Sequence, residues 1–396
     1  MFRIDRRSRR ELSIWAAGFL FVTGYLLVDL HRQSVAAPTS GTVRLTAEAL
    51  PSGPLKARER GSAVWTGKEM IYWGGRAGGQ TDLRYFADGA AYDPAARRWR
   101  SIAPAPLGAR SGHIAVWTGR EMIVWGGRAA GTGSILDGAA YDPANDRWHR
   151  LPSAPKGNAR EYGKGVWYGG LLMVGGGSGW GTDAQNPGRT LLTYTPGTRK
   201  WTASTLDHQV YDLVAGDHGV YALTFDRRTR ALDITEVQPL AREMRELPEP
   251  PVDQAPIGIG LAWSGNRLLV TLSGGDRTEV LQFSPRGMWS STGSVNATAF
   301  HPPISPGMDP QAHLSAWTGH SLLNYSPNGV ESYDPGKRTL QQIEGRFGRE
   351  DGYCGAGTTA VWTGSEILSW GGQNCRPGVP AQTSEGIRIT VSYPDV

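Results

Sequence analysis

The sequence is poor in the residues that most often carry out chemistry in proteins. Its 396 residues include only two cysteines and eight histidines. The histidines are scattered, with no His-x-x-x-His or Glu-x-x-His pair to place zinc ligands on one face. No Gly-x-Ser-x-Gly elbow or phosphate-binding glycine loop stands out. The sequence therefore predicts no catalytic residue, no metal site and no cofactor.

Long basic runs are also missing from most of the chain. The formal net charge is +5, but residues 1–33 contain six arginines against three acidic residues. The other 363 residues thus share only two net positive charges, without a Lys/Arg run that could follow a phosphate backbone. We therefore do not expect nucleic acid as a partner.

One long apolar run exists, and it lies close to the N-terminus. Residues 1–11 form a basic tail, and the segment from Leu12 to Leu30 carries no charge before Asp29. This length is sufficient for one helical crossing of a bilayer, and the preceding arginines predict a cytoplasmic N-terminus. We expect a signal-anchor helix over 12–30 and a linker over 31–41; a cleaved signal peptide is the alternative. Both place the remainder in the periplasm or at the cell surface.

Glycine, proline and tryptophan are abundant instead, with 54, 26 and 15 copies. The tryptophans recur: Trp65 and Trp73 return 52 residues later as Trp117 and Trp125. Fainter copies of the same unit follow, including a degenerate one at about 209–250. Seven units result, each reading as four short strands joined by Thr-Gly and Asp-Pro turns. Such units stack radially, which predicts an all-β, seven-bladed β-propeller over 42–396. An N-terminal strand at 42–47 should complete the last blade, and we expect a monomer.

The Gly-Gly pair that ends the second strand of a unit, followed by Tyr and then Trp, resembles the kelch repeat. It occurs as Gly74-Gly75, with Tyr92 and Trp99 after it, and again from Gly126-Gly127. The resemblance implies a kelch-like propeller, here expected to be of a bacterial, membrane-anchored type. Kelch-like propellers include binding modules as well as copper radical oxidases and sialic acid mutarotases. No motif of those enzymes beyond the repeat itself is present.

One face of the propeller should carry all the variable loops, where repeat proteins usually bind their ligands. Five arginines at equivalent repeat positions and one loop tryptophan form the predicted ligand site: Arg58, Arg76, Arg110, Arg128, Arg160 and Trp180. Guanidinium groups pair with carboxylates, which suits an anionic or carbohydrate ligand. In the alternative interpretation, the arginines pack on tryptophans or pair with Asp88 and Asp137.

The two cysteines, Cys354 and Cys375, lie at equal distances from the hairpin turn of the last unit. We expect a disulfide between them in an exported domain, worth roughly 3 kcal/mol for a loop of about 20 residues. A metal site is the weaker alternative, since no histidine is adjacent.

These features predict a membrane-tethered binding or scaffold module whose variable loops bind a protein or a glycan. An enzyme acting on an acidic sugar is the alternative, and assistance in assembling a larger envelope complex is a third possibility. If the arginines form the site, replacing Arg58, Arg110 and Arg160 together should abolish binding and leave the melting temperature nearly unchanged.

Overall fold

The computed structural model describes residues 43–79, 82–131, 133–178, 187–226, 229, 231–252, 258–274, 277–296, 314–326, 329–344, 357–373 and 382–393. The predicted basic tail, signal-anchor helix and linker at 1–41 lie outside these residues. Within them, no helix has the length and apolar character needed to cross a membrane. The only helical element described is the short 3-10 turn η2 (Pro187–Arg189). Residues 43–396 form one compact unit.

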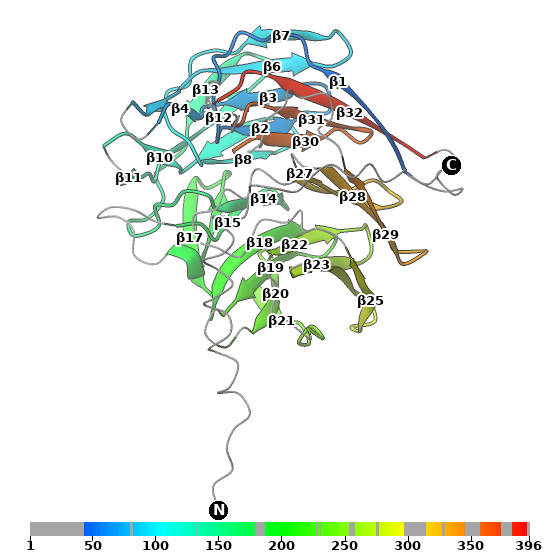
Figure 1. The fold of residues 1–396 in the computed structure, drawn as a ribbon. Helices are drawn as coiled ribbons and strands as arrows, with labels where there is room; N and C mark the ends of the chain where they lie inside the picture. The colour runs from blue at the N-terminus through cyan, green and yellow to red at the C-terminus, as the bar shows by residue number, and fades with distance from the viewer. Residues whose placement is uncertain are drawn as a thin grey trace, which may run out of the picture. The chain divides into compact units, whose positions relative to one another are not determined.

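Seven four-stranded antiparallel sheets make up this unit (Figure 1). Blade one contains β2 (Ser62–Trp65), β3 (Met70–Trp73), β6 (Gly89–Asp93) and β7 (Arg98–Ser101). Blade two contains β8 (Ile114–Trp117), β9 (Met122–Trp125), β12 (Gly138–Asp142) and β13 (Arg147–Arg150). Blade three contains β14 (Lys164–Tyr168), β15 (Leu171–Gly175), β16 (Thr190–Thr195) and β17 (Lys200–Thr205).

The later blades repeat this order. Blade four contains β18 (Gln209–Ala215), β19 (Val220–Phe225), β20 (Leu232–Gln238) and β21 (Glu243–Glu246). Blade five contains β22 (Gly258–Trp263), β23 (Leu268–Gly274), β24 (Arg277–Phe283) and β25 (Trp289–Asn296). Blade six contains β26 (Leu314–Trp317), β27 (Leu322–Ser326), β28 (Gly329–Asp334) and β29 (Thr339–Glu344). The first strand of each blade contacts the first strand of the next around the full ring, from β2 to β30 and back to β2.

Blade seven combines both ends of the described chain. It contains β30 (Thr359–Trp362), β31 (Glu366–Trp370) and β32 (Gly386–Ser392), and its outermost strand is β1 (Arg44–Ala49). β1 pairs antiparallel with β32 from Arg44 opposite Ser392 to Ala49 opposite Ile387. The ring is thereby closed by hydrogen bonds between segments more than 330 residues apart. The prediction of an all-β, seven-bladed propeller is confirmed.

Repeated aromatic residues hold the first blades together. In blade one the ring of Tyr92 lies 5.0 Å from that of Trp99, and blade two repeats this pair at the same distance. The Trp99 indole donates a hydrogen bond to the Pro51 carbonyl, and its ring lies 6.1 Å from that of Trp370 in blade seven. Each tryptophan of this kind therefore contributes apolar area and one hydrogen bond across a blade boundary.

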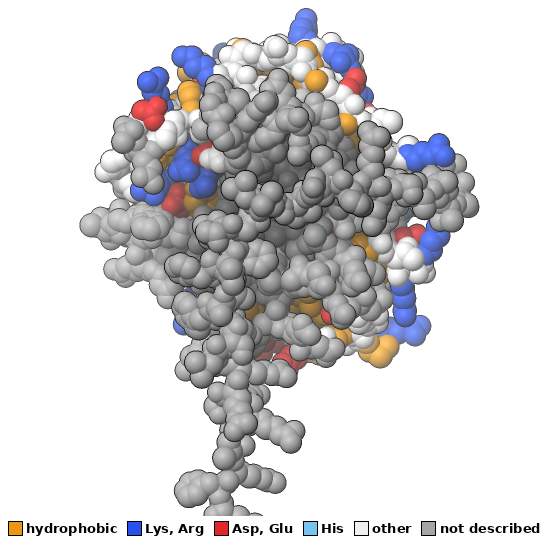
Figure 2. Space-filling model, in the orientation of Figure 1, with side chains coloured by type: hydrophobic (Ala, Val, Ile, Leu, Met, Phe, Trp, Pro, Cys, Tyr) orange, Lys and Arg blue, Asp and Glu red, His pale blue; other side chains and the backbone are white. Residues whose placement is uncertain are grey.

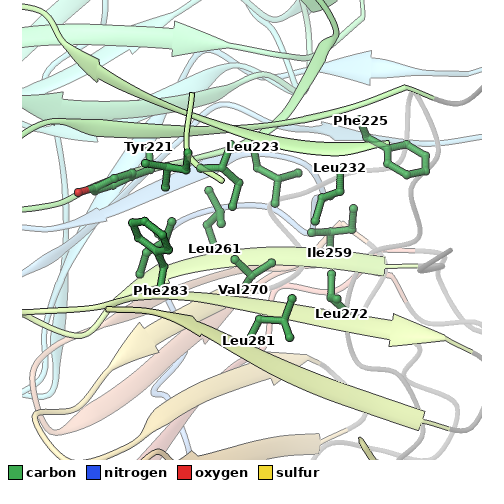
Figure 3. Packing of buried hydrophobic residues seen from close by; sticks show 13 residues of the cluster. Tyr221, Leu223, Phe225, Leu232, Ile259, Leu261, Val270, Leu272, Leu281 and Phe283 are labelled. Carbon is green, nitrogen blue, oxygen red and sulfur yellow. The ribbon is translucent and has the colours of Figure 1, made fainter. Parts of the chain in front are cut away.

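Blades four and five, where the repeat is degenerate, pack mainly through other apolar side chains. Figure 3 shows Leu223 and Leu232 of blade four facing Leu261, Val270 and Leu281 of blade five. These side chains belong to one cluster of buried residues that spans the boundary. Strands whose apolar side chains face the neighbouring blade are thus sufficient to form a blade without the repeat's tryptophans.

The two faces of the ring differ in their connections. On one face, called the short-turn face here, Thr66 Oγ1 accepts a hydrogen bond from the Glu69 amide, and Asp93 Oδ1 accepts from the Ala95 amide. These side-chain bonds fix tight turns of nearly uniform length. The opposite, loop face carries the longer connections, including two extra pairs of short strands in blades one and two.

Candidate functional site

Two short ribbons stand on the loop face of blades one and two. β4 (Arg76–Ala77) pairs with β5 (Arg84–Tyr85), and β10 (Arg128–Ala129) pairs with β11 (Gly133–Ser134). Each ribbon begins directly after a Gly-Gly pair with positive φ angles. At Gly75, for example, φ is 103° and a Cβ atom would lie 2.8 Å from the Glu59 carbonyl oxygen. Only glycine permits the close approach that starts the ribbon.

The three arginines at 58, 110 and 160 are buried, with 0%, 1% and 0% of their surface exposed. Their contacts repeat from blade to blade. Each Nη1 donates to the carbonyl of the first glycine of the pair that ends the second strand, at 3.2–3.3 Å, and each Nε donates to a carbonyl two residues earlier. These arginines therefore link the loop that leads into each blade to the end of its second strand.

The carboxylate partners are present in two of the three blades. Arg58 Nη1 and Nη2 donate to the two carboxylate oxygens of Asp88, at 2.6 and 3.1 Å. The Arg58 guanidinium carbon lies 3.8 Å from the centroid of the Phe86 ring. Arg110 forms an ion pair with Asp137 at 2.7 Å. Burial acts to raise the pKa of Asp88, but the hydrogen bonds and charge of Arg58 outweigh it, so the pKa lies below its usual value.

Arg160 occupies the same place in blade three, where Thr190 stands in the position of Asp137. The Thr190 carbonyl accepts a hydrogen bond from Arg160 Nη1 at 2.9 Å, as the Asp137 carbonyl does from Arg110. Among the described residues no carboxylate contacts Arg160, and burial lowers its pKa to about 10. The shared backbone contact shows that the arginine site is a property of the repeat.

The other two predicted arginines are only partly buried. Arg76 Nε donates to Oε1 of the buried Glu59 at 2.9 Å, and Arg128 lies 3.8 Å from the buried Glu161. About 41% of the Arg128 side chain remains exposed. In Figure 2, basic, acidic and hydrophobic side chains lie together over the region where Figure 1 labels β4 and β10. Arg76 and Arg128 can therefore contact a ligand, whereas the buried three stabilise the loops.

A groove lies between the two ribbons and has a volume of about 430 Å³. Seven residues line it: Leu83, Tyr85, Arg128, Ala129, Ala130, Gly131 and Gly133. Leu83 is exposed, at 36%, and Tyr85 is half-buried. The groove therefore combines apolar walls with one basic side chain. Leu83 was not predicted from the sequence, because a single leucine in a loop carries no pattern.

A second feature that the sequence did not reveal joins blades one and three across blade two. Arg60 donates a hydrogen bond to the Tyr162 hydroxyl, and its guanidinium carbon lies 5.2 Å from the centroid of that ring. Gly112, at the equivalent position of blade two, has a φ of 61°, and a Cβ there would lie 2.9 Å from the Tyr162 ring. The glycine is the only sequence signal for this contact.

His113, which shares its repeat position with His313, is structural. Its ring lies 5.0 Å from that of Trp73 and is completely buried. Desolvation, reinforced by the nearby charge of Arg110, lowers its pKa to about 3. His113 is therefore neutral and unsuited to act as a proton acceptor near pH 7.

Three predicted positions, Trp180, Cys354 and Cys375, lie outside the described residues, and so does His313. The ligand role of Trp180 and the disulfide remain predictions. Within the described ranges, no group of three or more His, Cys, Asp or Glu side chains is placed to hold a metal ion.

Comparison with known proteins gives a family-model match to part of the chain. Residues 29–216 match the model of the KLHDC2/KLHL20/DRC7 Kelch-repeats domain. The match begins at residue 29 and covers β1, the first three blades and β18 of blade four. The Gly-Gly, Tyr and Trp positions of the repeat are clearest in the first three blades. No curated protein matches the chain. The family match and the seven blades together support a kelch-repeat propeller.

Proposed function

We propose that this kelch-repeat propeller is a protein-binding scaffold module that engages its partner with the groove between β4–β5 and β10–β11. The observation that carries the proposal is the groove itself, which places an exposed leucine beside Tyr85 and Arg128 on a rigid ring. Aromatic residues and arginine dominate the energetics of protein interfaces. Kelch-repeat propellers generally mediate protein interactions, which agrees with this role.

A protein ligand fits this surface better than an acidic sugar does. An enzyme for sugar acids would need accessible cationic side chains for the substrate carboxylate, but Arg58, Arg110 and Arg160 are buried and bound to backbone carbonyls. Their burial favours the alternative interpretation that they are structural. What remains accessible at the groove is largely apolar, with a basic rim, and such a surface is suited to side chains of another protein.

We further propose that the propeller is tethered to a membrane by the segment at 12–30 and faces the periplasm or the cell surface. The support is the uncharged apolar run and the arginines before it. In such an oxidising compartment a Cys354–Cys375 disulfide would form in blade seven.

Affinity purification of the full-length protein from cells that express it tests the binding function. Leu83→Asp combined with Arg128→Glu should remove a specific partner, because a carboxylate replaces the exposed leucine and the groove's charge is reversed. Lys68→Glu, an exposed change on the short-turn face, is the matched control. The captured protein must then bind the purified propeller directly. A partner that is lost with Lys68→Glu and kept with the groove variant would contradict the proposed site.

A further inference from the structure

The ribbon of blade one has one edge that is already used and one that is open. On its inner side, β4 is bridged to Glu59: the Glu59 amide donates to the Arg76 carbonyl, and the Arg76 amide donates to the Glu59 carbonyl, both at 2.8 Å. On its other side, β4 pairs with β5, and β5 has no further strand beside it among the described residues. The isolated bridge at Glu59 thus covers one side of the two-stranded ribbon, and among the described residues the ribbon ends at β5.

The register determines which backbone groups face the open edge. Arg76 lies opposite Tyr85, but both backbone groups of Arg76 are bonded to Glu59. In an antiparallel pair, such opposed residues form the non-hydrogen-bonded type, and their amide and carbonyl groups point away from each other. Hydrogen-bonded and non-hydrogen-bonded pairs alternate along an antiparallel ladder. The neighbouring pair is accordingly hydrogen-bonded: the Phe86 amide donates to the Gly75 carbonyl. The amide and carbonyl of Tyr85 therefore point away from β4.

No backbone hydrogen bond from the described residues uses these two groups of Tyr85. An unpaired amide and carbonyl on a strand edge form a template for another strand. Ser134 holds the corresponding position in blade two, but its side chain is buried. Tyr85 is only half-buried and lines the groove, so the accessible edge is that of blade one.

The side chains around this edge indicate the chemistry of the occupant. Leu83, the residue before β5, and Tyr85 of β5 both line the groove, as does Ala129 of β10. Arg84 between them is exposed, and Arg128 is partly exposed across the groove. Asp82 lies two residues before Arg84, with its Oδ1 bonded to the Gly79 amide, and the buried Glu161 lies 3.8 Å from Arg128. An added strand would therefore meet an apolar strip, with the exposed Arg84 beside it and the partly exposed Arg128 across the groove.

We propose that the open edge of β5 binds an extended peptide segment of the partner by β-strand addition. The inference rests on the proposed protein-binding function and specifies how the groove is used. One residue of the segment exchanges two backbone hydrogen bonds with Tyr85, an apolar side chain packs on Leu83, and an acidic side chain pairs with Arg84 or Arg128. Backbone bonds provide affinity in this mode, and the side-chain contacts provide specificity.

The probes are peptides selected from a phage-displayed library of random dodecapeptides for binding to the immobilised full-length protein. The selected peptides should contain an apolar residue flanked by Asp or Glu. Each is then synthesised with a single N-methyl group at successive positions, and its affinity for the unmodified protein is measured by calorimetry. Strand addition predicts a loss of roughly tenfold at the residue whose amide donates to Tyr85, and little change at the adjacent residues, whose amides point away.

Two protein variants test whether the peptide binds at the edge of β5. Tyr85→Pro removes the amide donor and should weaken binding by roughly tenfold or more. Tyr85→Phe keeps the backbone and the ring and should bind as the native protein does. Native binding by Tyr85→Pro, or uniform tolerance of N-methylation, would overturn strand addition, and so would a library that yields no groove-binding peptide.

The outcome also separates this inference from the proposed function. If the natural partner is lost with Leu83→Asp and Arg128→Glu but is retained by Tyr85→Pro, the groove binds protein through side chains and strand addition is wrong. If the partner is retained by all of these variants, both proposals fail.

Discussion

The Arg110 guanidinium lies 2.7 Å from the Asp137 carboxylate, and only 1% of the arginine is exposed. Three carbonyls, those of Gly108, Gly126 and Asp137, accept further hydrogen bonds from the same side chain at 3.0, 3.2 and 3.3 Å. A buried charge with this set of partners connects the loop between blades one and two to the second strand of blade two. Its role is therefore to hold the loop face in place.

Removing this side chain should destabilise the protein. Arg110→Met keeps much of the apolar stem but leaves the Gly108 and Gly126 carbonyls without their donor. We expect the free energy of unfolding to fall by about 3 kcal/mol, as for other broken buried pairs. Urea unfolding followed by tryptophan fluorescence measures it. Arg98→Met, at an exposed site on β7, is the control and should change stability by less than about 0.5 kcal/mol. Equal stability of both variants would contradict the structural role.

This expectation replaces the one drawn from the sequence, in which the triple substitution of Arg58, Arg110 and Arg160 left the melting temperature nearly unchanged. Their burial leads us to expect a lower melting temperature instead. Any loss of binding in that variant would then reflect altered loops as well as lost charges.

Blade three offers the complementary experiment, because Thr190 replaces the carboxylate there. Thr190→Asp should give Arg160 an ion-pair partner and raise stability by about 1 kcal/mol, since bonds to charged groups exceed neutral ones. Asp137→Thr makes blade two resemble blade three and should lower stability by a similar amount. The measurement is the urea midpoint at pH 7 for the two single variants and the double variant. Changes of the same sign in both would show that the two sites are not equivalent.

Much of the fold could be predicted because the repeat fixes it locally. Trp73 and Trp125 occupy equivalent positions of the repeat, 52 residues apart. The short strands around them carry apolar side chains that become buried when four-stranded blades stack on one another. Even blade four, which lacks the repeat's tryptophan, was found from apolar runs such as 220–225. The repeat also indicated that a strand before residue 50 belongs to blade seven.

The site was harder to predict, since equivalent positions look alike whether they are buried or exposed. Arg58 and Arg76 both recur in the repeat, yet one is bound to carbonyls inside and the other reaches the surface. What separates them is the set of partners: Arg58 is bonded to the Lys56 and Gly74 carbonyls and to Asp88, whereas Arg76 is bonded to Glu59. The groove depends on two ribbons from different blades, and no single segment of sequence encodes it.

Stability should depend on pH through Glu331, a completely buried residue on β28. Burial raises its pKa to about 7, partly opposed by a hydrogen bond from Asn324. Between about pH 4.5 and 7 the folded state keeps a proton that the unfolded chain releases, so the unfolding free energy falls as pH rises. Above pH 7 this contribution becomes constant.

Glu331→Gln should remove that dependence while preserving shape. At pH 8 the variant should be more stable than the native protein by roughly 2–4 kcal/mol, and at pH 4 the two should be nearly equal. Urea midpoints at half-unit intervals from pH 4 to 8 give the comparison. Parallel curves for the two proteins would show that Glu331 is ionised at neutral pH in the folded state.

Closure of the ring by β1 can be tested with two truncations. Deleting residues 1–41 leaves β1 paired with β32, and this shortened chain serves as the reference. Deleting residues 1–49 also removes Val43, whose side chain is buried against blades six and seven, and exposes the edge of β32. Loss of that burial alone should cost about 2 kcal/mol, and the open edge should promote pairing between molecules. Light scattering after size-exclusion chromatography should show a monomer for the first truncation and dimers or larger species for the second. A stable monomer from both would mean that blade seven holds without its fourth strand, and that the ring is closed by its inner strands alone.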